Sequence, residues 1–162
     1  MIKQISGKRV LAWLPAVGVA AAIFLFSAQP AQESTQVSNR VIELLLQTFG
    51  LFGMAPVSPE RMAELYEILT FPIRKCAHMT EYMILYATLL PAVGGWKQNR
   101  KRCLWTAFGL TVLYACTDEF HQLFVPGRAG RITDVLIDSA GALVLTVVLS
   151  KKRSLQQEDG RI

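Results

Sequence analysis

Residues 74–82 bring a histidine, a carboxylate and two basic side chains together in the segment Arg-Lys-Cys-Ala-His-Met-Thr-Glu-Tyr. On a helix, Arg74, His78 and Glu81 share one face because residues three and four apart are neighbours. That face could combine an anion-binding arginine with an imidazole tuned by a carboxylate. Arg74 and Lys75 are equally well explained as interfacial residues that extend toward lipid headgroups. That explanation does not cover the deeper His78 and Glu81, for which we favour a functional role.

A second polar motif, Thr-Asp-Glu-Phe-His-Gln, occupies residues 117–122. Asp118, His121 and Gln122 share a helical face, and Glu119 lies beside them in the sequence. The Asp-x-x-His spacing could hold a histidine tautomer for acid–base catalysis or supply two metal ligands. A polar helix end at the water boundary would explain the same residues without a function. Because apolar residues flank the motif on both sides, we favour a site.

Basic and acidic residues follow this motif. Pro126-Gly127 predicts a turn, and Arg128 and Arg131 beyond it suit the binding of phosphate or carboxylate. Asp134 and Asp138 are four apart and therefore face one way on a helix. They could bind a divalent cation, share a proton or pair with the arginines of the other motifs, and a purely structural ion pair with Arg74 or Arg128 explains them equally well.

A fourth polar element, Phe-Ser-Ala-Gln-Pro, occupies residues 26–30. Ser27 and Gln29 could line the same site as the other motifs, although a simple helix end explains them equally well. Small residues at positions 139–142 favour the close approach of another helix.

Long apolar blocks separate these motifs and must position them. The chain has 162 residues, of which 52% are hydrophobic and 18% charged, whereas a soluble domain averages about 25% charged residues. No residue from Val10 to Gln32 carries a charge. At about 1.5 Å per residue, this run is long enough to cross the roughly 30 Å hydrocarbon core of a membrane.

The sequence therefore predicts an all-α, polytopic membrane protein that forms a single domain over residues 1–162. We expect about four transmembrane helices, at residues 10–28, 72–93, 103–120 and 132–150. For the first, we favour an uncleaved helix over a signal peptide, because the apolar run exceeds the usual length of about 7–15 residues. The other three are long enough only if they include ionisable residues, which should then face the bundle interior.

The distribution of Lys and Arg predicts the orientation. Three precede the first span, two lie between the first and second, four follow the second, two follow the third and four follow the fourth. By the positive-inside rule, both termini and the loop at 97–102 are cytoplasmic. The net charge of +5 thus lies in short clusters between apolar blocks, which excludes a nucleic-acid-binding stripe.

This orientation places all of the polar motifs at one depth, on the outer side of the membrane. The outer segment from Gln29 to Phe71 contains two stretches with helical spacing of apolar residues, and Ser58-Pro59-Glu60 predicts a helix start. We expect two short amphipathic helices there, lying on the outer surface or capping the bundle.

Taken together, these motifs resemble the VanZ-like family of bacterial membrane proteins. The similar segments are Phe-Ser-x-Gln at 26–29, Arg-Lys-x-x-His-x-x-Glu-Tyr at 74–82, Asp-Glu-x-His-Gln-x-Phe-x-Pro-x-Arg at 118–128, and Asp-x-x-x-Asp-x-x-Gly at 134–141. They span nearly the whole chain in order. The resemblance implies a multi-pass protein of the bacterial cytoplasmic membrane. The name-giving member is associated with resistance to teicoplanin, a lipoglycopeptide that binds cell-wall precursors.

Three functions are compatible with this outward polar layer. The first is a role in glycopeptide resistance, through binding of the drug or of a lipid-linked cell-wall precursor at an Arg-containing site. The second is a membrane-embedded hydrolase or transferase acting on an anionic lipid-linked substrate. The third is an ion or proton relay.

The candidate residues fall into three groups. The expected acid–base residues are His78, Glu81, Asp118, Glu119 and His121. The expected ligand-binding residues are Ser27, Gln29, Arg74, Lys75, Gln122 and Arg128. Asp134 and Asp138 are available for a divalent cation, the one cofactor that the sequence suggests.

Overall fold

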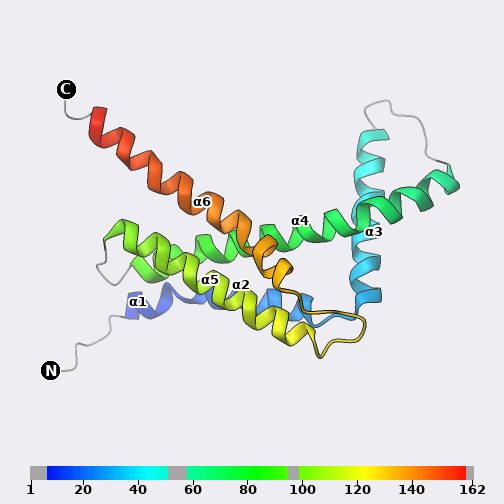
Figure 1. Ribbon diagram of the computed structural model, residues 1–162, viewed down its shortest axis with the longest axis horizontal. Helices are drawn as coiled ribbons and strands as arrows, with labels where there is room; N and C mark the ends of the chain where they lie inside the picture. Colours follow the sequence, from blue (N-terminus) through cyan, green and yellow to red (C-terminus); the bar gives the residue numbers. More distant parts are fainter. Residues whose placement is uncertain (1–6, 51–57, 95–98, 160–162) are drawn as a thin grey trace.

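The computed structural model describes residues 7–50, 58–94 and 99–159, and every regular element in these ranges is a helix. The prediction of an all-α fold is confirmed. The helices are α1 (Gly7–Leu11), α2 (Leu14–Ser27), α3 (Ala31–Gly50), α4 (Pro59–Gly94), α5 (Arg100–Gln122) and α6 (Ile132–Asp159) (Figure 1).

Helix α4 is the centre of the fold. It packs against α2, α3, α5 and α6, while α5 and α6 also pack against each other. Its buried side chains include Tyr82, Leu85, Tyr86 and Leu89, which meet Ala107 of α5 in the core. Gly141 of α6 lies so close to α4 that an added Cβ would be 2.4 Å from Cγ of Met83. The prediction that small residues near 140 permit close helix packing is confirmed.

Two segments are long and apolar enough to cross a membrane. They are Arg9–Ser27, with a mean hydropathy of 2.2, and Ile132–Lys151, with a mean hydropathy of 1.9. Only 17% and 28% of these segments are buried inside the molecule. Neither segment is therefore the buried core helix of a soluble fold, since large apolar side chains such as Leu25 and Val144 face outward.

Helix α4 is longer than the sequence suggested. We expected a transmembrane helix to begin near Pro72, but the helix begins at Pro59 and continues through Pro72. Ser58 caps this start, because its hydroxyl oxygen accepts a hydrogen bond from the backbone N–H of Arg61 at 3.3 Å. Pro72 has no N–H to donate within the helix, and it lies on an exposed part of α4.

The first outer segment contains one separate amphipathic helix rather than two. Helix α3 crosses the first part of α4, which itself corresponds to the second short helix that we expected (Figure 1). Polar contacts join them: Thr70 donates a hydrogen bond of 2.9 Å to the side-chain oxygen of Asn39, and Tyr66 donates one of 2.5 Å to Glu43.

The helix ends divide into two groups along the bundle. The C-terminal end of α2, the C-terminal end of α5 and the start of α6 lie together at one end (Figure 1). Helix α1, the end of α4, the start of α5 and the end of α6 lie toward the other.

Lys3, Lys97 and Arg161, which contribute to the predicted orientation, lie outside the described residues. Asn99 caps α5 by accepting a hydrogen bond of 3.0 Å from the backbone N–H of Lys101.

Candidate functional site

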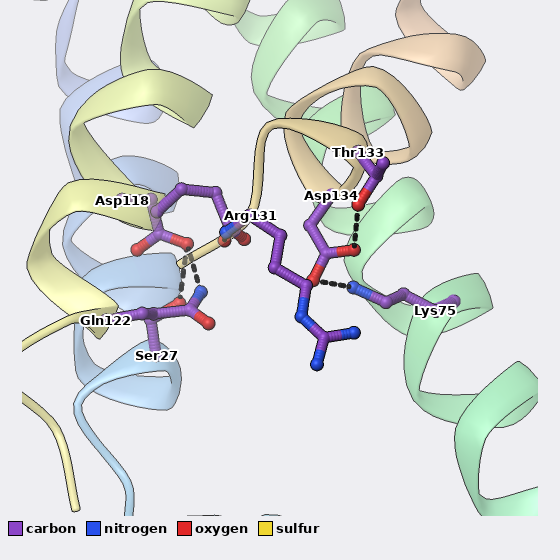
Figure 2. Close-up of polar contacts among 8 residues, drawn as sticks. Ser27, Lys75, Asp118, Gln122, Arg131, Thr133 and Asp134 are labelled. Carbon is purple, nitrogen blue, oxygen red and sulfur yellow. Dashed lines mark hydrogen bonds and ion pairs between the residues drawn. The ribbon is translucent and has the colours of Figure 1, made fainter. Parts of the chain in front are cut away.

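A buried polar contact joins α2 to α5 at the end of the bundle where the motifs meet. The hydroxyl of Ser27 donates to Oδ2 of Asp118 at 2.9 Å, and Nε2 of Gln122 donates to the same oxygen at 3.0 Å (Figure 2). Ser27 is completely buried, and Asp118 and Gln122 are 3% and 5% exposed. The second Asp118 oxygen has no hydrogen-bond partner among the described residues. A partly satisfied carboxylate therefore lies inside the bundle.

Glu119 connects the end of α5 to the start of α6. Its Oε2 accepts a hydrogen bond of 2.9 Å from the backbone N–H of Arg131. Gly130 permits this contact, since a Cβ at that position would lie 2.1 Å from the backbone oxygen of Glu119. The preceding turn is the one that Pro126-Gly127 predicted, and Gly127 adopts a φ of 72° that favours glycine.

An ion pair joins α4 to α6. Nζ of Lys75 lies 2.7 Å from Oδ2 of Asp134, and the two side chains are 13% and 16% exposed (Figure 2). This is the structural pairing that the sequence left open for Asp134, although with a lysine rather than an arginine. Among the described residues, no group of three or more His, Cys, Asp or Glu side chains is arranged to hold a metal ion. A divalent cation at Asp134 and Asp138 therefore stays a prediction from the sequence.

Asp138 lies one turn deeper in α6 and is 1% exposed. Its Oδ1 has no hydrogen-bond partner among the described residues. Four charged or ionisable side chains act on it electrostatically, and they come from α4 and α5: Lys75, His78, Asp118 and Glu119. The hydroxyl of Tyr82, also without a partner in the described part, faces the same two aspartates, Asp118 and Asp138. The structure thus brings α4, α5 and α6 together around two buried aspartates, Asp118 and Asp138, which we call the acidic centre.

His78 and Glu81 share one face of α4, as their spacing predicted. Nδ1 of His78 lies 3.3 Å from Oε2 of Glu81. His78 is 8% exposed, whereas Glu81 is half-buried. This arrangement places an imidazole next to a carboxylate at the edge of the acidic centre.

His121 has a different neighbour from the one that its motif suggested. Its ring stacks on Phe24 of α2, with centroids 4.5 Å apart. Asp118, the expected orienting group, instead accepts hydrogen bonds from Ser27 and Gln122. Nδ1 of His121 is buried and has no hydrogen-bond partner in the described part of the chain.

Arg128 lies above the end of α2. Its Nε donates to the backbone oxygen of Gln29 at 3.3 Å, so Gln29 contributes its backbone rather than its side chain to this contact. Within residues 7–50, 58–94 and 99–159, neither Arg128 nor Arg74 forms an ion pair. Both are half-buried. Burial, followed by the positive charge of Arg74, lowers the pKa of the Arg128 guanidinium below its ordinary value.

Three residues of this region had no predicted role. Tyr82 ends the first motif, and its hydroxyl faces the buried aspartates. Phe24 lies one helical turn before Ser27, a spacing that could have placed it on the same face. Gly130 carries no pattern that distinguishes it, because its importance depends on a contact with the end of α5.

A bundle whose large apolar side chains face outward, while carboxylates and a histidine are buried at one end, is the arrangement of a membrane protein. The sequence matches the family model described as VanZ/LLP1 over residues 12–153. Because this match covers most of the chain, the protein belongs to the VanZ/LLP1 family. No curated protein and no solved structure matches the chain.

Proposed function

We propose that this protein spans the bacterial cytoplasmic membrane four times and binds an anionic, phosphate- or carboxylate-bearing group at its outward-facing polar end. The ligand belongs to the cell envelope or acts on it: a lipid-linked cell-wall precursor or a glycopeptide. Both termini are cytoplasmic in this proposal, as the distribution of Lys and Arg predicts.

The observation that carries the proposal is the pair of half-buried arginines. The charge of Arg74 acts on Arg128, as do the carboxylates of Asp118, Glu119 and Glu81, but neither arginine forms an ion pair in the described part of the chain. An anion between them would offset this repulsion. A guanidinium presents its N–H donors in a planar fork that matches phosphate and carboxylate oxygens.

Helix α5 supports the four-span part of the proposal. Helix α5 has 23 residues, which is about 35 Å at about 1.5 Å per residue and enough to cross the hydrocarbon core. Its polar Asp118 and Gln122 are buried, while Leu113 and Phe120 face outward. Ionisable residues that face the interior are compatible with a transmembrane segment.

The direct test is binding of a simple anionic lipid to the full-length protein in phosphatidylcholine nanodiscs. Farnesyl phosphate is the probe, farnesol is the uncharged control, and inorganic phosphate tests whether a free anion suffices. We expect Arg128→Ala and Arg74→Ala each to weaken farnesyl phosphate binding by about tenfold, the loss of one charge-assisted contact. Arg61→Ala is the matched control, because Arg61 is exposed and pairs with Glu64. Unchanged binding in both site variants would contradict the proposal.

The cellular role requires a separate experiment. Deletion of the gene and re-expression of wild type or of Arg128→Ala would be followed by measurement of teicoplanin and vancomycin susceptibility. The proposal expects deletion to increase susceptibility to teicoplanin and Arg128→Ala to fail to reverse it. Unchanged susceptibility to both drugs would remove the resistance role while leaving the binding test in place.

A second candidate function is favoured by the His78–Glu81 pair. Nδ1 of His78 lies 3.3 Å from Oε2 of Glu81 without forming a hydrogen bond, and a small reorientation would bring the pair into the geometry for proton transfer. The candidate is a hydrolase or transferase that acts on an anionic lipid-linked substrate. Comparison of envelope lipids from cells with wild type, His78→Gln or His121→Ala tests it. Identical lipid profiles in all three strains would contradict catalysis.

A further inference from the structure

The structure contains an apolar groove below the polar end, along the line where α2 and α5 run side by side over α4. We call this line the α2–α5 seam. The groove has a volume of about 310 Å³. Its lining includes residues of all three helices: Ala16, Val17, Ala20, Leu85, Leu89 and Leu113. Trp13 and Thr117 also line it, and Thr117 directly precedes Asp118 of the polar end.

The helix faces that line the groove run on toward the polar end. On α5, the groove-lining Tyr114 and Thr117 are followed at helical spacing by His121. On α2, Val17 and Ala20 are followed in the same way by Phe24, the residue on which the His121 ring stacks. The same two helix faces therefore form the walls of the groove and the approach to the polar end.

Few polar contacts hold the seam together. Tyr114 donates a hydrogen bond of 2.5 Å to the backbone oxygen of Ala20 at the level of the groove. Ser27 and Asp118 form the next one, at the polar end. Ala20 and Ser27 are seven residues apart, which is about 10 Å along a helix.

We propose that the groove binds the hydrocarbon chain of the same ligand whose anionic group is held by Arg74 and Arg128, so that the ligand is a lipid phosphate. The inference rests on the proposed function for the headgroup and adds the class of ligand. The headgroup lies at Arg128, and the chain passes over the outer side of the stacked Phe24 and His121 rings before it enters the groove onto Leu85 and Leu89. Thr117 marks the transition between the two parts.

Binding of geranyl, farnesyl and geranylgeranyl phosphate tests the groove. The full-length protein is reconstituted in phosphatidylcholine nanodiscs, and each affinity is corrected for partition into nanodiscs without protein. Affinity rises with chain length in the wild type. Ala20→Leu, which fills the groove from α2, lowers the affinity for geranylgeranyl phosphate by about tenfold, toward that of geranyl phosphate.

Ala22→Leu is the matched control, because Ala22 is exposed and does not line the groove. It leaves the chain-length dependence unchanged. Leu113→Trp fills the groove from α5. Because Leu113 is 61% exposed, the larger side chain should not disturb folding. This variant replaces Ala20→Leu if circular dichroism shows that Ala20→Leu is unfolded. It flattens the chain-length dependence in the same way.

The outcomes separate the two proposals. Equal corrected affinities for the three chains, or filled-groove variants that bind like wild type, would overturn the groove site, while a loss in Arg128→Ala would still support the headgroup site. Conversely, chain-length dependence that persists with no effect of Arg128→Ala and Arg74→Ala would overturn the headgroup site and with it the assignment of a lipid phosphate.

Discussion

Ser27 and Asp118 lie 91 positions apart in the chain, yet the Ser27 hydroxyl donates a buried hydrogen bond of 2.9 Å to the Asp118 carboxylate. This contact ties the end of the first long apolar segment to the most distinctive polar motif. It also sets the rotation of α2 relative to α5, and hence the side of α2 that faces the groove and the side that faces lipid.

We expect Ser27→Ala to lower the free energy of unfolding by about 1.5–3 kcal/mol, because a hydrogen bond to a charged group is lost inside the bundle. Unfolding of the purified protein in mixed micelles measures this change. Ser150→Ala is the control, since Ser150 donates only to the backbone oxygen of Thr146 in its own helix. Its effect should stay within about 0.5 kcal/mol. Equal effects of the two variants would contradict the interhelical contact.

The Lys75–Asp134 pair should behave as a buried ion pair. We expect Lys75→Met or Asp134→Leu alone to cost about 3–5 kcal/mol, because each leaves one charge unpaired. The double variant should cost less than either single change. The exposed Arg61–Glu64 pair provides the comparison, and there the corresponding changes should cost no more than about 1 kcal/mol. Additive effects at Lys75 and Asp134 would show that the two side chains do not interact.

Gly130→Ala should disrupt the junction between α5 and α6. An added Cβ would lie 2.1 Å from the backbone oxygen of Glu119, so the backbone must move and the Arg131–Glu119 hydrogen bond is weakened. We expect the free energy of unfolding to fall by about 1–3 kcal/mol, measured by unfolding of the purified protein in mixed micelles. Gly109→Ala, with nothing within 4 Å of the new Cβ, should be neutral or stabilise by up to about 1 kcal/mol. A tolerated Gly130→Ala would refute the close approach.

The sequence predicted which polar residues share a helix face better than it predicted their partners on other helices. Spacing alone placed His78 and Glu81 on one face, and the structure has them 3.3 Å apart. By contrast, the partner of Asp118 depends on how α2 is rotated against α5, and no local pattern encodes that rotation. A motif-based argument therefore paired Asp118 with His121, whereas the structure pairs it with Ser27 and Gln122.

Helix boundaries were likewise predicted correctly where the signal is local and wrongly where tertiary packing decides. The capping signal at Ser58-Pro59-Glu60 is local, and α4 does begin at Pro59. Pro72 is also a strong local signal, but packing of α3 against the first part of α4 holds the helix continuous through it. A local rule therefore predicted a boundary that tertiary contacts removed.

The proposed topology predicts the accessibility of single cysteines. In a background in which Cys76, Cys103 and Cys116 are replaced by alanine, a membrane-impermeant maleimide should label Ala129→Cys in intact cells. Lys151→Cys should be labelled only after the membrane is opened. Both positions are exposed in the structure, so differences in labelling report the side of the membrane. The reverse pattern would contradict the outward orientation of the polar end.

The central claim is that the polar end holds the anionic group of a lipid at Arg128. Solid-state NMR of the reconstituted protein, with nitrogen-labelled arginine and farnesyl phosphate, measures it as a dipolar coupling between guanidinium nitrogen and headgroup phosphorus. We predict a coupling in the wild type and in Arg74→Lys, where Arg128 is the guanidinium of the proposed pair that remains. The coupling should disappear when Arg128→Lys is added to Arg74→Lys and persist when Arg61→Lys is added instead. A coupling that survives in the Arg74→Lys, Arg128→Lys double variant, or the absence of any coupling in the wild type under saturating ligand, would contradict the claim.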